Sequence, residues 1–177
     1  MVVRLTHHNI DTAATMAGTE DIEFLEGYPA DFLEAPAKNI TVEPVNFTKA
    51  GLREYEGLYA VVIDNALSPD ECQTLFDAAE AQTSGQWERA QINIGGGRQA
   101  TFVDQRNCGR SIWDSKDMVA RIWKRIEHAV PEIQRLEKQA KVTGNGPVKR
   151  GEVWKLTRLN ERMRFLKYEG GEYFRGR

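Results

Sequence analysis

The junction between residues 58–65 and the segment that follows constrains the fold more than any other part of this sequence. Leu58–Asn65 is a short apolar run, rich in β-branched residues and bounded by turn formers, which predicts a buried strand. A helix start follows, because Ser68 can cap a helix, Pro69 suits the first helical position and Glu71 completes a Ser-x-x-Glu capping box. Four residues then recur at helical spacing and predict its buried stripe: Cys72, Leu75, Phe76 and Ala79.

Residues 1–50 show neither a helical nor a strand period. We expect them to form an irregular leader to a single domain of residues 51–177. Trp87–Phe102 predicts one or two strands around Gly95–Gly97. These glycines indicate a β-turn and not a phosphate-binding loop, because residues 98–101 lack the Lys-Ser/Thr that such a loop requires.

The second half of the chain predicts one more long helix and several strands. Asp114 or Ser115 can cap a helix that ends near Ala129, whereas 132–142 predicts a further short helix. Residues 153–168 predict one or two strands, Gly170-Gly171 a turn and residues 172–174 the next strand. The order strand, helix, strands, helix, strands indicates an α+β fold with helices on one side of a sheet.

Composition excludes several classes of partner. The 177 residues carry a formal net charge of −2, with 41% hydrophobic and 28% charged residues, which is near the average for globular proteins. This charge gives no argument for nucleic acid or an anionic membrane, and no run is long enough to span a bilayer. The N-terminus lacks the apolar core of a secretory signal, and two isolated cysteines match no metal-binding spacing. We therefore expect an intracellular protein.

Three segments together resemble prolyl 4-hydroxylase-like dioxygenases, which depend on Fe(II) and 2-oxoglutarate. Residues 159–174, LNERMRFLKYEGGEYF, resemble the strand, acidic Gly-rich turn and aromatic residue that precede the His-x-Asp metal motif of that family. Residues 64–72 look like the family's opening strand-to-helix unit, and 104–110 look like its arginine-containing loop near the substrate. The resemblance covers about residues 55–174 and is carried by these three segments in the family's order.

The resemblance implies an oxidoreductase that hydroxylates a protein or a small molecule with Fe(II), 2-oxoglutarate and O2, with ascorbate as the accompanying reductant. It also implies the front half of a double-stranded β-helix, a jelly-roll-like barrel. Tyr168 corresponds to the tyrosine whose hydroxyl can hydrogen-bond 2-oxoglutarate, although a packing role at the strand end is equally open. Arg106 and Arg110 correspond to the substrate-side loop, or they satisfy loop carbonyls and surface acids. Cys108 is interpreted as a quiet loop thiol between these two arginines.

The iron ligands expected from the resemblance are absent from this sequence. By count from Tyr168, Arg177 stands where the first ligand histidine belongs, and arginine offers no lone pair. His7, His8 and Asp11 are better interpreted as a polar tail than as a metal site, and His128 as a helix-end residue. We therefore expect no metal site, no tight cofactor binding and no turnover in these 177 residues.

Three interpretations stay open at this point. The first is a fragment of a dioxygenase, and the second is a non-catalytic binding or regulatory protein derived from the same fold. The third is an unrelated α+β domain. Missing strands would leave open sheet edges and exposed apolar faces, so we expect the isolated chain to be unstable or to aggregate.

Overall fold

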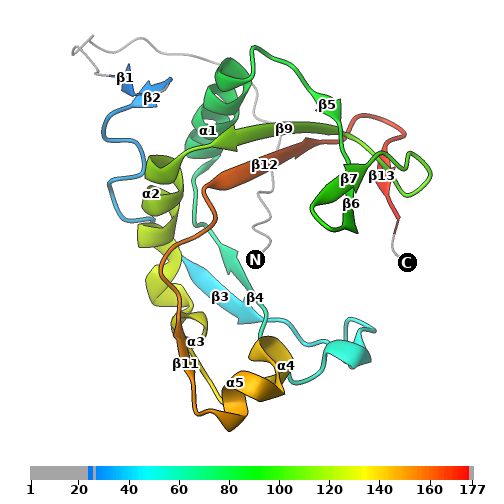
Figure 1. Cartoon of the computed structure of the whole chain (residues 1–177). Coiled ribbons are helices and arrows are strands. Elements are labelled where there is room, and N and C mark those ends of the chain that lie inside the picture. The colour runs from blue at the N-terminus through cyan, green and yellow to red at the C-terminus, as the bar shows by residue number, and fades with distance from the viewer. Residues whose placement is uncertain (1–23, 26, 176–177) are drawn as a thin grey trace. The chain divides into compact units, whose positions relative to one another are not determined.

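The computed structural model describes residues 24, 25 and 27–175 as a mixture of helices and antiparallel strand pairs (Figure 1). The longest elements are helices α1 (Pro69–Gln82) and α2 (Lys116–Ile126) and strands β9 (Gly109–Asp114) and β12 (Arg162–Lys167). This mixture confirms the predicted α+β class. No helix among the described residues is both long and apolar enough to cross a membrane.

The described residues form two compact units. The first unit holds residues 31–72 and 117–159, and the second holds 73–116 and 160–175 with the described residues before 31.

The first unit contains most of α2, two antiparallel strand pairs and several short helical segments. Strand β3 (Thr41–Pro44) pairs antiparallel with β4 (Val61–Asp64), so that Thr41 lies opposite Asp64. Strand β10 (Arg135–Glu137) pairs antiparallel with β11 (Val153–Lys155). The short helical segments are η1 (Arg53–Tyr55), η2 (Glu127–Ala129), α3 (Pro131–Gln134), α4 (Ala140–Thr143) and α5 (Asn145–Lys149).

Three expectations for this unit need correction. Thr41–Pro44, placed in an irregular leader, is a strand because β4 supplies its hydrogen-bonding partner. Strand β4 is alternately half-buried and exposed, not buried, and Val62 is 47% exposed. The single short helix expected at 132–142 is divided, because residues 135–137 pair with β11 and Lys138 has a positive φ of 56°.

The start of α1 is fixed by the predicted capping box. The Ser68 amide donates to Glu71 Oε2 at 2.7 Å, and the Glu71 amide donates to Ser68 Oγ at 3.2 Å. The two contacts satisfy orphan amides at the helix N-terminus, as the box requires.

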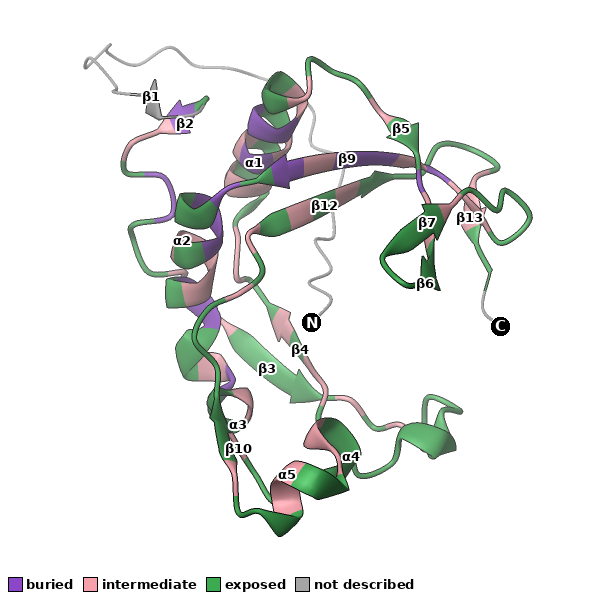
Figure 2. Cartoon of the chain, viewed as in Figure 1, coloured by how far each residue is buried: buried purple, intermediate pink, exposed green. Residues whose placement is uncertain are grey.

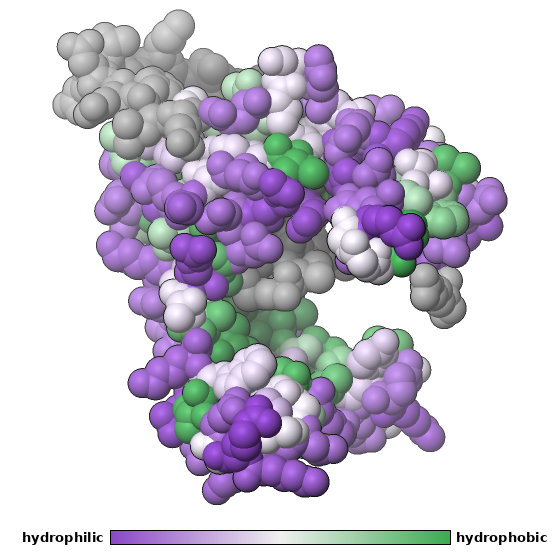
Figure 3. All heavy atoms as spheres, in the orientation of Figure 1, coloured by the Kyte–Doolittle hydropathy of each residue, from purple (hydrophilic) through white to green (hydrophobic). Residues whose placement is uncertain are grey.

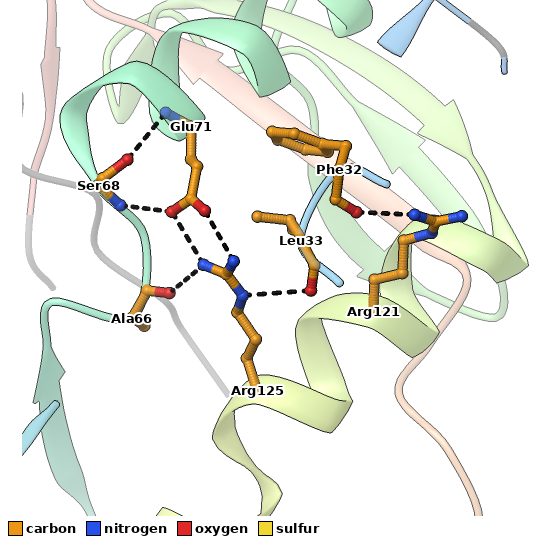
Figure 4. Close-up of polar contacts among 7 residues, drawn as sticks. All are labelled: Phe32, Leu33, Ala66, Ser68, Glu71, Arg121 and Arg125. Carbon is orange, nitrogen blue, oxygen red and sulfur yellow. Dashed lines mark hydrogen bonds and ion pairs between the residues drawn. The ribbon is translucent and has the colours of Figure 1, made fainter. Parts of the chain in front are cut away.

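Glu71 also forms an ion pair with Arg125 of α2 (Figure 4). Arg125 donates from Nη1 to Glu71 Oε2 at 2.8 Å and from Nη2 to Oε1 at 2.7 Å. Its remaining donors reach the backbone oxygens of Leu33 and Ala66, each at 3.3 Å. The Arg125 side chain is 5% exposed, so the guanidinium joins three chain segments from inside the unit.

The same contacts set the protonation of Glu71. Burial alone would raise its pKa, but the hydrogen bonds from Arg125 and Ser68 together outweigh burial and hold the pKa below its ordinary value of 4.5. Arg121, one turn earlier on α2, adds a hydrogen bond to the Phe32 carbonyl at 2.8 Å (Figure 4). Phe32 and Leu33 are both buried. The arginines of α2 therefore hold this segment by hydrogen bonds to its carbonyl oxygens, in addition to side-chain packing.

A three-stranded antiparallel sheet in the order β12-β9-β5 is the centre of the second unit. Strand β5 (Glu88–Arg89) pairs with β9, and β8 (Arg106–Asn107) pairs with β13 (Tyr173–Phe174). The remaining pairs are β6 (Ile92–Gly95) with β7 (Arg98–Ala100) and β1 (Phe24–Leu25) with β2 (Tyr28–Pro29). Gly95, Gly96 and Gly97 all have positive φ, which confirms the predicted turn.

Strand β9 carries the core of this unit, as the buried residues along it show (Figure 2). Trp113 lies 5.9 Å from the Tyr28 ring and 6.4 Å from the Phe165 ring, measured between centroids. Phe76 of α1 stacks on Trp87 at 6.0 Å, and Trp87 Nε1 donates to Glu80 Oε1 at 2.9 Å. Aromatic contacts therefore link the helix α1 to Trp87, and β9 to β12 and β2.

Hydrophobic side chains occur among many hydrophilic ones on the face shown in Figure 3. The most exposed large ones in the two units are Val142 at 57% and Phe174 at 61%. Scattered apolar exposure of this kind is ordinary for globular proteins.

We expect Glu71→Gln to lower the free energy of unfolding by about 2–4 kcal/mol, because it leaves the buried Arg125 charge without a carboxylate. Urea unfolding followed by circular dichroism measures this difference. Glu54→Gln, at an exposed position of η1, removes the same charge and serves as the control, with an expected change within about 0.5 kcal/mol. Equal effects of the two substitutions would show that the ion pair is not stabilising.

The stabilisation by Glu71 should also depend on pH. Because its pKa in the folded chain lies below 4.5, the contribution is fully present above that pH and is lost as pH falls through the folded pKa. We therefore expect the difference in unfolding free energy between the wild type and Glu71→Gln to narrow between about pH 6 and about pH 3. A difference that stays constant over this range would contradict the assignment.

Candidate functional site

Strand pairing in the second unit determines where the predicted site residues lie. Tyr168 directly follows β12, Arg106 begins β8 and Arg110 is the second residue of β9. In the β12–β9 register, Lys167 lies opposite Gly109. Tyr168 follows Lys167 and Cys108 precedes Gly109, so Tyr168 lies near Cys108 and Arg106.

Tyr168, Cys108 and Arg106 form one cluster. Burial raises the pKa of Tyr168 most, and a hydrogen bond and charge interaction with Cys108 raise it further, whereas Arg106 acts in the opposite direction. The Cys108 side chain is fully buried, while Tyr168 is 44% exposed. The phenol therefore lies between a buried thiol and solvent, with a cation beside it.

The second strand pair holds the Arg106 guanidinium in place. Phe174 lies opposite Arg106 in the β8–β13 register, and the Arg106 Cζ is 4.8 Å from the Phe174 ring centroid. The Arg175 amide donates to the Gln105 carbonyl at 2.9 Å and extends this pairing by one contact. The ring thus covers one face of the guanidinium, which also forms a hydrogen bond with Tyr168.

The Nε of Arg106 is buried and has no hydrogen-bond partner among the residues that the structure describes. A buried donor left unsatisfied costs about 1–3 kcal/mol, and more when the group is charged. Such groups are rare in folded proteins and each calls for an explanation.

Arg110 has a different environment. Its Nε and Nη2 both donate to Glu88 Oε1, at 3.0 and 2.6 Å, and Nη1 donates to Gln99 Oε1 at 2.8 Å. Its side chain is 6% exposed. Arg110 therefore joins β9 to β5 and β7, and the structure gives no argument for substrate contact by this residue.

Glu172 stabilises the turn between β12 and β13, and the sequence did not indicate it as a site residue. Its carboxylate forms an ion pair with Arg89 of β5 and accepts the Glu169 amide at 3.0 Å. The hydrogen bond from the Glu169 amide, and after it the hydrogen bond and charge of Arg89, lower the pKa of Glu172. An acid directly after Gly170-Gly171 was the available signal, because it can close such a turn onto its own backbone.

Metal ligands are a separate question. Among the described residues, no group of three or more His, Cys, Asp or Glu side chains could hold a metal ion. His7, His8 and Asp11 lie outside the described residues, and His128 is exposed in η2 of the first unit. The described residues therefore do not fit the facial triad that Fe(II) needs.

Comparison with known proteins gives no relative for this chain. No protein-family model matches the sequence, and no curated protein or solved structure has significant similarity to it.

We expect Arg110→Gln to lower the free energy of unfolding by about 2–3 kcal/mol, because it removes the buried cation that joins three strands. Thermal and urea unfolding measure the effect. Arg98→Gln, at an exposed position on β7, makes the same change in charge and should stay within about 0.5 kcal/mol of the wild type. A neutral result for Arg110→Gln would mean that the Glu88 contact contributes no stability.

Proposed function

We propose that these residues form the front part of a 2-oxoglutarate- and Fe(II)-dependent dioxygenase domain of the prolyl 4-hydroxylase type. The domain would be a double-stranded β-helix, and its reaction would be the hydroxylation of a protein or a small molecule. Tyr168 would lie on the side that binds the cosubstrate.

The observation that carries this proposal is the path of the chain from β12 to β13. Strand β12 ends at Lys167, Tyr168 follows it, and the chain turns through Glu169–Glu172 and returns as Tyr173–Phe174 beside Arg106. The segment whose sequence resembles the approach to the family's metal motif therefore has the expected strand-turn-strand form. It also brings together two of the three residues singled out by the resemblance.

The groups present in this cluster fit one part of the chemistry. A tyrosine hydroxyl and a guanidinium are both hydrogen-bond donors to a carboxylate, and 2-oxoglutarate carries two carboxylates. For the iron, the described residues supply no triad, so we assign no step of the reaction to a metal held by them. In this proposal, the contribution of these residues is to bind and orient the cosubstrate.

Binding of 2-oxoglutarate to the 177-residue protein tests the proposal. We expect saturable binding by calorimetry in metal-free buffer, weakened about fivefold by Tyr168→Phe, because that substitution removes one hydrogen-bond donor and keeps the ring. Tyr59→Phe is the matched control, because Tyr59 is 42% exposed and belongs to the first unit. We expect no release of CO2 from 2-oxoglutarate above the rate with Fe(II) and ascorbate alone.

Two outcomes would count against this function. Absence of any 2-oxoglutarate binding by the wild type would remove the cosubstrate role of Tyr168. Decarboxylation by the 177-residue protein would show that it supplies iron ligands after all.

A further inference from the structure

The formal charge of −2 for the whole chain averages over an uneven distribution. Residues 135–158, which we call the basic segment, contain seven cations against two acids, Glu137 and Glu152, and so have a formal charge of +5. The segment lies within the first unit and forms β10, α4, α5 and β11. Its cations are all exposed: Arg135, Lys138, Lys141, Lys149, Arg150, Lys155 and Arg158.

Strand register brings two of these cations together. Arg135 lies directly opposite Lys155 in the antiparallel β10–β11 pair. Like charges at opposed positions repel one another and destabilise such a pair. Glu137 relieves Arg135 at 3.0 Å, but the same carboxylate also serves Lys138 at 3.9 Å. No acidic partner is found for Lys155 among the described residues, so this end of the strand pair keeps an excess of positive charge.

An exposed aromatic ring lies beside the cations. Trp154 is 49% exposed, and its Nε1 donates to Glu152 Oε2 at 3.2 Å. The other oxygen of this carboxylate pairs with Arg150, so Glu152 holds the indole and a guanidinium close together. Lys149, next to Arg150, has no acidic partner in the part of the chain that the structure describes. The basic segment therefore offers a flat apolar ring with positive charge around it.

The cations and apolar side chains are spread over both faces of the strand pair. Successive side chains of a strand point to opposite faces, so Val153 and Lys155 share one face and Trp154 lies on the other. All three residues of β11 are exposed, and β10, α4 and α5 are largely exposed in Figure 2. A membrane-surface element gathers its apolar residues on one face. This distribution instead suits a flexible polyanion that can contact both faces.

We propose that the basic segment binds single-stranded nucleic acid, with its cations on the phosphates and Trp154 stacked on a base. Exposed cations that follow the backbone, combined with an aromatic ring that stacks on bases, are the groups that bind single strands without sequence preference. An acidic peptide would satisfy the cations but leave the indole without a stacking partner. The inference goes beyond the proposed function and does not rest on it, because Tyr168 belongs to the second unit.

Fluorescence anisotropy of a labelled oligouridylate of about 12 nucleotides tests the proposal on the 177-residue protein. We expect saturable binding whose logarithmic affinity falls with the logarithm of salt concentration with a slope of about −3, the value for about four neutralised phosphates. This measurement on the wild type needs no variant. Polyglutamate of matched charge and vesicles containing phosphatidylserine are the alternative probes, and we expect both to bind at least about fivefold more weakly.

Two lysine substitutions test the phosphate contacts. Lys149→Gln combined with Lys155→Gln should weaken oligouridylate binding about tenfold or more at low salt and reduce the magnitude of the salt slope by about 1. Lys38→Gln combined with Lys49→Gln is the matched control, because both lysines are exposed in the same unit but lie outside the basic segment. This control should change the affinity less than about threefold.

Substitutions of Trp154 test the stacking contact separately. Trp154→Leu should weaken binding about fivefold or more and leave the salt slope unchanged, because stacking releases no counterions. Trp154→Phe keeps an aromatic ring and should lose less affinity than Trp154→Leu. In the wild type, the indole N–H resonance of Trp154, assigned by its absence in Trp154→Phe, should shift during titration with oligouridylate.

Three results would overturn the inference. The first is equal affinity for polyglutamate and oligouridylate with no effect of Trp154→Leu, which would identify an acidic protein as the partner. The second is binding to the vesicles without binding to the oligonucleotide, which would assign the surface to a membrane. The third is no oligouridylate binding by the wild type at about 50 mM salt. None of these results bears on 2-oxoglutarate binding, so the proposed function stands or fails separately.

Discussion

The pairing of β9 with β12 is the constraint on which the second unit and its candidate site depend. Six residue pairs, from Arg162 opposite Asp114 to Lys167 opposite Gly109, join segments far apart in the sequence. The register places Trp113 beside Phe165 on one side and directs Tyr168 toward Cys108 at the strand end. A slip of one residue would reverse the faces of β12 and separate the phenol from its neighbours. Core packing and site geometry are thus set by the same hydrogen-bond ladder.

Three buried or half-buried arginines show how the protein assigns the same side chain to different tasks. Arg125 and Arg110 have carboxylate and backbone or amide partners that offset the free energy of removing a cation from water. Both side chains connect separate segments of the chain, so replacing either one is expected to lower the free energy of unfolding. Arg106 has an aromatic ring below it and a donor without a partner. Arg106 also hydrogen-bonds Tyr168, so this arginine connects the β8–β13 pair to the end of β12.

Local signals in the sequence predicted the elements that depend on neighbouring residues. The Ser68–Glu71 capping box and the turn at Gly95–Gly97 are confirmed, because each needs only four or three consecutive residues. Strand β3 was missed because its partner β4 lies beyond an intervening helical turn and β3 itself is exposed along its length. The Glu71–Arg125 pair spans 54 positions, and no period or motif indicates which of many charges will meet.

The candidate site shows the same limit. The sequence indicated Tyr168, Arg106 and Arg110 together, but only strand register shows that Arg106 and Tyr168 share a cluster while Arg110 is fastened elsewhere. The family resemblance implies two properties together, carboxylate binding and oxygen activation, but they depend on different groups. Holding a carboxylate requires donors fixed at one edge of the sheet, whereas oxygen activation requires a metal and its ligands. A chain can possess the first without the second, so binding by Arg106 and Tyr168 is a question independent of turnover.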